Sequence, residues 1–242
     1  MVAGLRAATA LLTRIPMTTT PDVGRGAPWL PIVGGLIGAT TAGVYAAAHP
    51  WTPPLAAATI ATIAAIALTG GLHEDGLADC ADGFWGASTP QRRREILKDP
   101  RHGTFGVSAI VADLMLRVSL LAALGPLEAL RALVVAAALG RASAVAIMLT
   151  GRPAAGPGIG ASAITSLRRR STVVGMLVAA TGAATIGRWW GVAAVAASAI
   201  VALAIGRLSV AKIGGVVGDS LGSAARVSEQ AVMLIAVGVM LR

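Results

Sequence analysis

The sequence predicts an all-α integral membrane protein, a polytopic bundle of helices that spans the bilayer. The chain has 242 residues, of which 55% are hydrophobic and only 13% are charged, whereas soluble domains carry about 25% charged residues. A soluble domain of this length would need a more charged surface. Aromatic residues are scarce, and the 30 glycines are typical of membrane helices that pack closely through small residues.

Seven apolar stretches approach the length of about 20 residues that a bilayer span needs. We expect six or seven transmembrane helices and a short N-terminal helix that lies at the membrane interface. The fifth and sixth stretches meet at GRWWG, and they form either two spans with a tight turn or one broken element. The last stretch contains Glu229 and is the weakest. The stretches are 30–49, 54–72, 105–124, 128–149, 171–187, 189–206 and 226–241.

The basic residues predict the orientation of the bundle. If the N-terminus is cytoplasmic, 15 of the 20 lysines and arginines fall in cytoplasmic segments, and only Arg188 and Arg242 fall outside. Excess positive charge marks the cytoplasmic side of a membrane protein. We therefore expect the N-terminus and the long polar segments to be cytoplasmic. The net charge of +9 has this explanation, and we expect no nucleic-acid partner.

The stretch GGLHEDGLADCADGFWG places four of the eleven acidic residues within nine positions. If the second span continues into it as a helix with about 100° per residue, Asp75, Asp79 and Asp82 fall within an arc of about 60°. Gly76 and Gly83 lie on or beside that stripe. Like charges at this spacing repel one another, so a distant or bound group must supply positive charge.

A divalent cation is the economical source of that charge, because no Lys or Arg lies between Arg25 and Arg92. Mg²⁺ commonly takes one or two carboxylates together with substrate phosphates. A solvated acidic loop is the alternative, but it leaves the shared face unexplained. His73 would contact a metal or a phosphate, or be a boundary histidine. Glu74 and Cys80 lie off the stripe. We expect Glu74 to be solvated and Cys80 to pack against neighbouring side chains.

Two further polar stretches carry groups that phosphate would need. RRREILKDPRHGTFG supplies the donors Lys98, Arg101 and His102, and KIGGVVGDSLGSAARVSE places Lys212 and Asp219 among glycines. If the three polar stretches converge at the cytoplasmic surface, they combine carboxylates for Mg²⁺ with cations for phosphate. That combination suits phosphoryl transfer, in which catalysis is mostly positioning and charge stabilisation.

Charged residues inside spans are costly and are usually paired or functional. Asp113 and Arg117 are four residues apart, which predicts an ion pair within one helix. Arg141 has no acidic neighbour in the sequence, and it would reach either an anionic substrate or the Asp cluster.

The acidic stretch resembles the signature of the cobalamin synthase family, the adenosylcobinamide-GDP ribazoletransferases. That signature is GG-hydrophobic-H-x-DGLAD-x-x-DG, and the resemblance extends in order through LLTRIP, ILKDPRHGTFGV, LGR and GGVVGDSLGSAARVSE. It implies a Mg²⁺-dependent enzyme of the bacterial plasma membrane that forms a single transmembrane catalytic domain over residues 1–242. Such an enzyme joins adenosylcobinamide-GDP to α-ribazole or its 5′-phosphate and releases GMP.

The implied reaction assigns roles to the candidate residues. A ribose hydroxyl would attack the phosphate nearest the cobinamide, and one of the aspartates would be its general base. The expected catalytic residues are Asp75, Asp79 and Asp82. The expected metal ligands are Asp75, Asp79, Asp82 and Asp219. The expected phosphate- or substrate-binding residues are His73, Lys98, Arg101, His102, Arg141, Lys212, Gly76 and Gly83.

Two other functions compete with this interpretation. A CDP-alcohol phosphotransferase shares D-x-x-D-G, but its motif continues with A-R, whereas Gly83 is followed by Phe84 and Trp85. A cation or metabolite transporter would explain charges inside spans, although its site should lie near the bilayer midplane. The sequence leaves open whether the chain forms a homo-oligomer and which form of α-ribazole it prefers.

Overall fold

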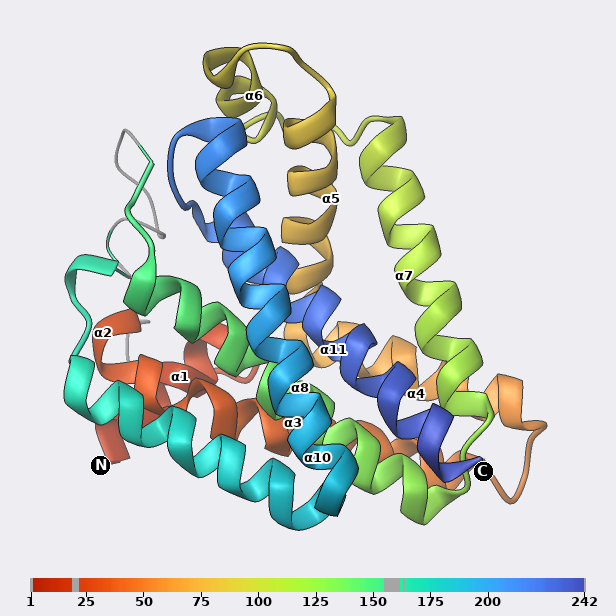
Figure 1. Cartoon of the computed structure of the whole chain (residues 1–242). Coiled ribbons are helices and arrows are strands. Elements are labelled where there is room, and N and C mark those ends of the chain that lie inside the picture. Colours follow the sequence, from red (N-terminus) through yellow and green to blue (C-terminus); the bar gives the residue numbers. More distant parts are fainter. Residues whose placement is uncertain (1, 19–21, 155–161, 163, 242) are drawn as a thin grey trace.

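The architecture is all-α, as the sequence predicts. The computed structural model describes residues 2–18, 22–154, 162 and 164–241, and the regular elements of these ranges are helices (Figure 1). A short 3₁₀ turn, Ala27–Trp29, joins the second helix to the third. The helices are α1 (Val2–Leu12), α2 (Val23–Gly26), α3 (Leu30–Ala48), α4 (Pro54–Thr69), α5 (Leu72–Trp85), α6 (Pro90–Ile96), α7 (Thr104–Ala122), α8 (Pro126–Thr150), α10 (Arg169–Ile213) and α11 (Gly218–Met240).

Five helical segments are long and apolar enough to cross a membrane. They are the continuous segment Val23–Ala48, which ends in α3, and the helices α7, α8, α10 and α11. The bent pair α4 and α5 would add a sixth span. The chain is therefore a polytopic helical membrane protein, and the short N-terminal helix is present as α1.

The predicted fifth and sixth stretches are two arms of one helix, α10. Its 45 residues are interrupted at Arg188, whose φ of 54° and ψ of −131° are not helical. Figure 1 shows the two arms running in different directions from this point. Gly191 lies so close to the carbonyl oxygen of Ala183 that a side chain would not fit there. Two helical arms therefore meet at a sharp break, and each arm contains one of the two predicted stretches.

The second span does not continue straight into the acidic stretch, and this expectation is corrected by the structure. α4 ends at Thr69, and α5 leaves it at an angle of 89°. The two residues between them, Gly70 and Gly71, have φ values of +70° and +72°, a left-handed conformation that glycine adopts without a Cβ penalty. The acidic residues are helical, but on an element that crosses the direction of α4.

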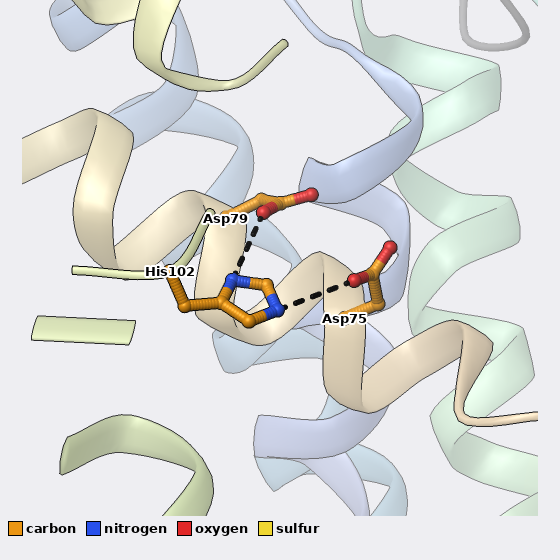
Figure 2. Close-up of side chains that lie close together, drawn as sticks. All are labelled: Asp75, Asp79 and His102. Carbon is orange, nitrogen blue, oxygen red and sulfur yellow. Dashed lines mark ion pairs between the residues drawn. The ribbon is translucent and has the colours of Figure 1, made fainter. Parts of the chain in front are cut away.

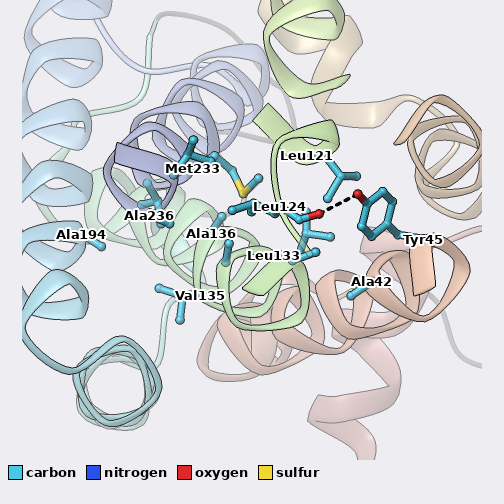
Figure 3. Packing of buried hydrophobic residues seen from close by; sticks show 14 of the residues in the cluster. Ala42, Tyr45, Leu121, Leu124, Leu133, Val135, Ala136, Ala194, Met233 and Ala236 are labelled. Atoms are coloured by element: carbon cyan, nitrogen blue, oxygen red, sulfur yellow. Dashed lines mark hydrogen bonds between the residues drawn. The ribbon is translucent and has the colours of Figure 1, made fainter. Parts of the chain in front are cut away.

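The core is centred on α8, which packs against α3, α10 and α11. The helices approach closely through small residues, because a Cβ on Gly38 of α3 would collide with the backbone of Leu133 in α8. Figure 3 shows part of this cluster, in which the hydroxyl of the buried Tyr45 donates a hydrogen bond to the carbonyl oxygen of Leu124 at 2.8 Å. The small residues therefore act in helix packing, as predicted.

Candidate active site

The three polar stretches of the sequence lie together around α5. A Cβ on Gly76 would be 3.0 Å from the carbonyl oxygen of Asp219, so α5 and the start of α11 are nearly in backbone contact. The second polar stretch also contacts the third. Arg94 of α6 donates a hydrogen bond to the carbonyl oxygen of Ile213, at the end of α10, at 2.9 Å. The bend at Gly70 directs α5 into this position.

Asp75, Asp79 and His102 form the central group of the site (Figure 2). One ligand atom from each residue lies within 4.8 Å of the others. The imidazole of His102 lies between the two carboxylates, with Nε2 3.6 Å from Asp75 Oδ1 and Nδ1 3.6 Å from Asp79 Oδ1. Asp75 is exposed and Asp79 is largely buried. The predicted stripe therefore contributes two carboxylates that face a shared space.

The charge around Asp79 is predominantly negative. α5 is not among the five spanning segments, and the pKa of Asp79 is raised to about 7. Burial is the largest cause, the carboxylates of Asp75, Asp219 and Asp82 add to it, and His102 opposes them. In the described part of the chain, no lysine or arginine forms an ion pair with Asp75 or Asp79. A bound cation would relieve this repulsion.

Asp82 has a different environment from the other two aspartates. Its Oδ2 accepts a hydrogen bond from the backbone N–H of Gly103 at 2.7 Å, and its Oδ1 accepts one from Gly106 N–H at 2.9 Å. The carboxylate thus binds the N-terminus of α7, where free N–H groups and the helix dipole favour negative charge. Gly103 follows His102 directly, so Asp82 positions the loop that carries the imidazole.

A buried network of charges lies behind the site. Arg226 is 2% exposed, and it pairs with Asp113 of α7, with Glu229 at 2.8 Å and with Glu74 at 3.6 Å. Gln230 also donates to Asp113 Oδ1 at 2.7 Å. Glu74 is therefore mostly buried against Arg226, and the expectation that it is solvated is wrong. The bend after α4 turns the face of α5 that carries Glu74 toward α11.

The expected ion pair between Asp113 and Arg117 is also replaced by contacts between helices. Arg117 pairs with Glu229 of α11 at 3.2 Å, and Arg141 of α8 pairs with the same carboxylate. Arg141 is therefore paired within the network, although it also lines the smaller cavity together with Asp75. In a packed bundle, a partner on a neighbouring helix can be closer than one four residues along the same helix, and sequence spacing does not show it.

Several other predicted residues have partners within the protein. Arg101 forms a bidentate pair with Asp99 on the surface, at 2.9 and 2.7 Å, and these bonds lower the pKa of Asp99 to about 2. The ammonium of Lys212 lies 5.7 Å from the ring centroid of Trp85, and Lys98 is exposed. Cys80 is buried, as expected.

The two glycines on the stripe serve helix packing in this structure. Gly76 faces the backbone of α11, and a Cβ on Gly83 would be 2.7 Å from the side chain of Leu97. Both positions are therefore filled by the protein itself, so their smallness brings α11 and α6 onto α5. A phosphate would have to reach the site from another side.

Two cavities meet at Asp75. The larger, of about 570 Å³, is lined by Arg14, Gly70, Glu74, Asp75 and His102, among others. Sequence reasoning assigned Arg14 to membrane topology alone, although the LLTRIP stretch that carries it is part of the family resemblance. The guanidinium packs across Gly70. The backbone N–H of Arg14 donates to Leu68 O at 2.8 Å, which fastens the segment to the end of α4.

The fold and the site together define a polytopic membrane protein with a carboxylate site at the junction of α5, α11 and the loop before α7. The smaller of the two cavities, of about 130 Å³, adjoins the same carboxylate from the side of α8 and α11. Two ligands could therefore meet at Asp75. This arrangement suits an enzyme that joins two substrates.

The chain belongs to the cobalamin-5-phosphate synthase family, whose model matches residues 4–237. The adenosylcobinamide-GDP ribazoletransferase of Azorhizobium caulinodans is 36% identical over 255 residues, which cover 97% of this chain and 95% of that protein. The enzymes of the same name from Brucella ovis and Ralstonia nicotianae are each 36% identical over 92% of this chain, and the matches cover 92% and 90% of those proteins. No solved structure gives a significant match.

This membership confirms the resemblance found in the sequence. The chain is a cobalamin synthase, a transferase of cobalamin biosynthesis in a membrane-spanning fold. The assignment supports the synthase interpretation over the transporter and CDP-alcohol alternatives.

Proposed function

We propose that the chain transfers the cobinamide phosphate of adenosylcobinamide-GDP to α-ribazole or α-ribazole 5′-phosphate. A ribose hydroxyl forms the new P–O bond, and the bond to the GMP leaving group breaks. The observation that carries this proposal is the pair of carboxylates, Asp75 and Asp79, that face each other beside His102, with Asp75 lining two cavities. The printed names of the relatives supply the donor substrate.

Mg²⁺ binding at Asp75 and Asp79 is the second part of the proposal. Carboxylate oxygens are the ligands that this hard cation prefers, and the two side chains share a space without a neighbouring lysine or arginine partner in the described residues. Asp219 adds negative charge from the first turn of α11. The ion would supply charge stabilisation for the phosphate oxygens. Imidazole suits transition metals better, so His102 is assigned to the phosphate.

The residues of the larger cavity are suited to the diphosphate of the donor. Arg14 provides a guanidinium, which binds phosphate with several N–H donors in a planar array, and His102 provides a second donor. Both line the cavity together with Asp75. We assign the role of general base to Asp75 or Asp79, whose carboxylates face a shared space beside His102.

The site and the N-terminus face the cytoplasm in this proposal, within the bacterial plasma membrane. The support is the uneven distribution of the 20 basic residues, since positive charge accumulates on the cytoplasmic side. Nucleotide substrates are also made in the cytoplasm, which agrees with this orientation.

The Asp79→Asn variant tests the proposal. Purified protein in lipid or detergent would receive adenosylcobinamide-GDP and α-ribazole, with Mg²⁺ or with EDTA, and GMP release would be measured. We expect Mg²⁺-dependent GMP release by the unmodified chain. We expect a loss of about 10²-fold or more in the variant, because charge stabilisation supplies most of the catalysis in phosphoryl transfer.

The matched control is Asp22→Asn, which makes the same chemical change at a residue that lines neither cavity. Asp22 caps the short α2, where its carboxylate accepts from Arg25 N–H at 3.0 Å, and asparagine caps helices about as well. GMP release by this control should stay near that of the unmodified chain. Full activity in EDTA would contradict the metal assignment, and full activity of Asp79→Asn would contradict the site.

A further inference from the structure

The smaller cavity at Asp75 is apolar over most of its wall. It lies between α1, α2, α3, α5, α8 and α11, and its volume is about 130 Å³. The apolar wall includes Leu12, Leu30, Ala144, Met148 and Leu221. Drug-sized ligands occupy pockets of roughly 300–1,000 Å³, so this cavity would hold a smaller group, such as a fused pair of aromatic rings.

His73 lines this cavity and is available to bind a ligand. The residue is only 6% exposed, it lines the cavity, and neither ring nitrogen forms a hydrogen bond with the described part of the chain. Buried polar groups normally have a hydrogen-bond partner, and here a ligand in the cavity could supply it. A neutral imidazole has one N–H donor and one acceptor nitrogen, so a ligand with one acceptor ring atom would pair with the N–H donor.

The position of the cavity relates it to the reaction. Asp75 and His73 belong to the first turn of α5, and Asp75 lines both the small cavity and the large one that contains Arg14 and His102. The large cavity holds the cationic groups that a diphosphate needs. The small one has a mostly apolar wall, and its polar lining consists of His73, the carboxylates of Asp75 and Asp219, and Arg141, which is paired with Glu229. Its volume excludes a macrocycle, and the two carboxylates disfavour a diphosphate.

We propose that the small cavity binds the aromatic base of the acceptor nucleoside, and that His73 donates a hydrogen bond to its unsubstituted ring nitrogen. The base of α-ribazole is a methylated benzimidazole, a flat and uncharged bicyclic ring with one such nitrogen. A base seated there brings the attached ribose to Asp75. This assignment rests on the proposed function, since it takes α-ribazole as the acceptor.

Steady-state kinetics of pocket variants test the assignment. Ala144→Leu fills the cavity, and His73→Ala removes the donor. We expect each to raise the KM for α-ribazole by about tenfold, as misfit or a lost hydrogen bond in a binding pocket does. The KM for adenosylcobinamide-GDP should remain within about twofold, because that substrate binds elsewhere. His73→Gln, which keeps a donor, should recover part of the loss.

The matched control is Ala146→Leu, which makes the same enlargement on α8. Ala146 is partly buried and does not line the cavity, so neither KM should change. A second measurement uses the unmodified chain, so it tests the assignment even if the pocket variants do not fold. In the unmodified chain, 5,6-dimethylbenzimidazole should inhibit competitively against α-ribazole and not against adenosylcobinamide-GDP.

The outcomes separate this inference from the proposed function. If the unmodified chain releases no GMP, the proposed function fails and the base assignment fails with it. If it releases GMP but Ala144→Leu and His73→Ala leave the KM for α-ribazole unchanged, only the base assignment is overturned. Loss of co-purified phospholipid in Ala144→Leu, with unchanged kinetics, would show that the cavity holds an acyl chain and would also overturn it.

Discussion

Asp75, Asp79 and Asp82 share one face of α5, yet their surroundings differ. Asp75 and Asp79 flank His102 at 3.6 Å each, whereas both oxygens of Asp82 accept backbone N–H groups of Gly103 and Gly106. The spacing of residues along a helix predicts a shared direction, but not which groups lie opposite. Two aspartates therefore remain for ligands, and Asp82 holds the loop that carries His102.

The Asp82→Asn variant tests this positioning role. Asparagine retains one acceptor oxygen and turns an N–H group toward the other backbone donor, so we expect the free energy of unfolding to fall by about 2 kcal/mol, in line with hydrogen bonds to charged groups. Thermal unfolding in detergent would show a lower Tm, and GMP release would also fall. Asp22→Asn, at an exposed cap, should change Tm little. Equal Tm values for both variants would refute the role.

At the scale of elements, the break between α4 and α5 determines where the acidic face points. Gly70 and Gly71 are both left-handed, and α5 leaves α4 at 89°. Without this turn, the face that carries Asp75 would not meet the start of α11. The same turn places Glu74 next to Arg226. One short connection thus positions both the site and the buried network.

Alanine substitutions at Gly70 and Gly71 separate the cost of a left-handed backbone from the cost of a steric clash. No described residue lies within 4 Å of a Cβ at Gly71, whereas a Cβ at Gly70 would collide with the Arg14 guanidinium. Gly71→Ala should therefore cost about 1–2 kcal/mol of stability through the left-handed backbone alone. Gly70→Ala should cost more and should also raise the KM for adenosylcobinamide-GDP, as measured by GMP release. An equal KM in the two variants would exclude Arg14 from substrate binding.

At the scale of the whole molecule, the buried charges tie four helices together. Glu74 of α5, Asp113 and Arg117 of α7, Arg141 of α8 and the pair Arg226 and Glu229 of α11 form one connected group. Its three guanidinium groups and three carboxylates balance in charge. Removal of any one of these charged side chains should destabilise the fold, because it leaves a buried charge without its partner.

Glu229→Gln should be strongly destabilising for this reason. The carboxylate pairs with Arg117, Arg141 and Arg226, and its removal should cost about 3–5 kcal/mol of stability, as for other broken buried pairs. Thermal unfolding in detergent would measure the change. Glu95→Gln is the control, because Glu95 pairs with Arg92 at 2.7 Å on the surface, where ion pairs add little. Similar Tm values in the two variants would contradict the role of the network.

Much of the fold and part of the site could be predicted from the sequence. Long apolar runs indicate spanning helices wherever lipid is the solvent, and a local 3.6-residue period places Asp75 and Asp79 on one face of α5. The partners of Asp113, Arg117 and Arg141 could not be predicted, since ion pairs between helices depend on how the helices pack. The bend at Gly70 was also missed, because an apolar run before and a helix after it do not reveal the angle between them.

The sequence by itself determined the all-α membrane class and the acidic helix, because these follow from composition and local periodicity, and its motifs identified the family. Only the tertiary structure decided which carboxylates face a cavity. It assigned Asp82 to the N-terminus of α7, placed Arg14 in the larger cavity and left His73 without a hydrogen-bond partner among the described residues. The physical reason is that the environment of a charged group is set by neighbours that are distant along the chain.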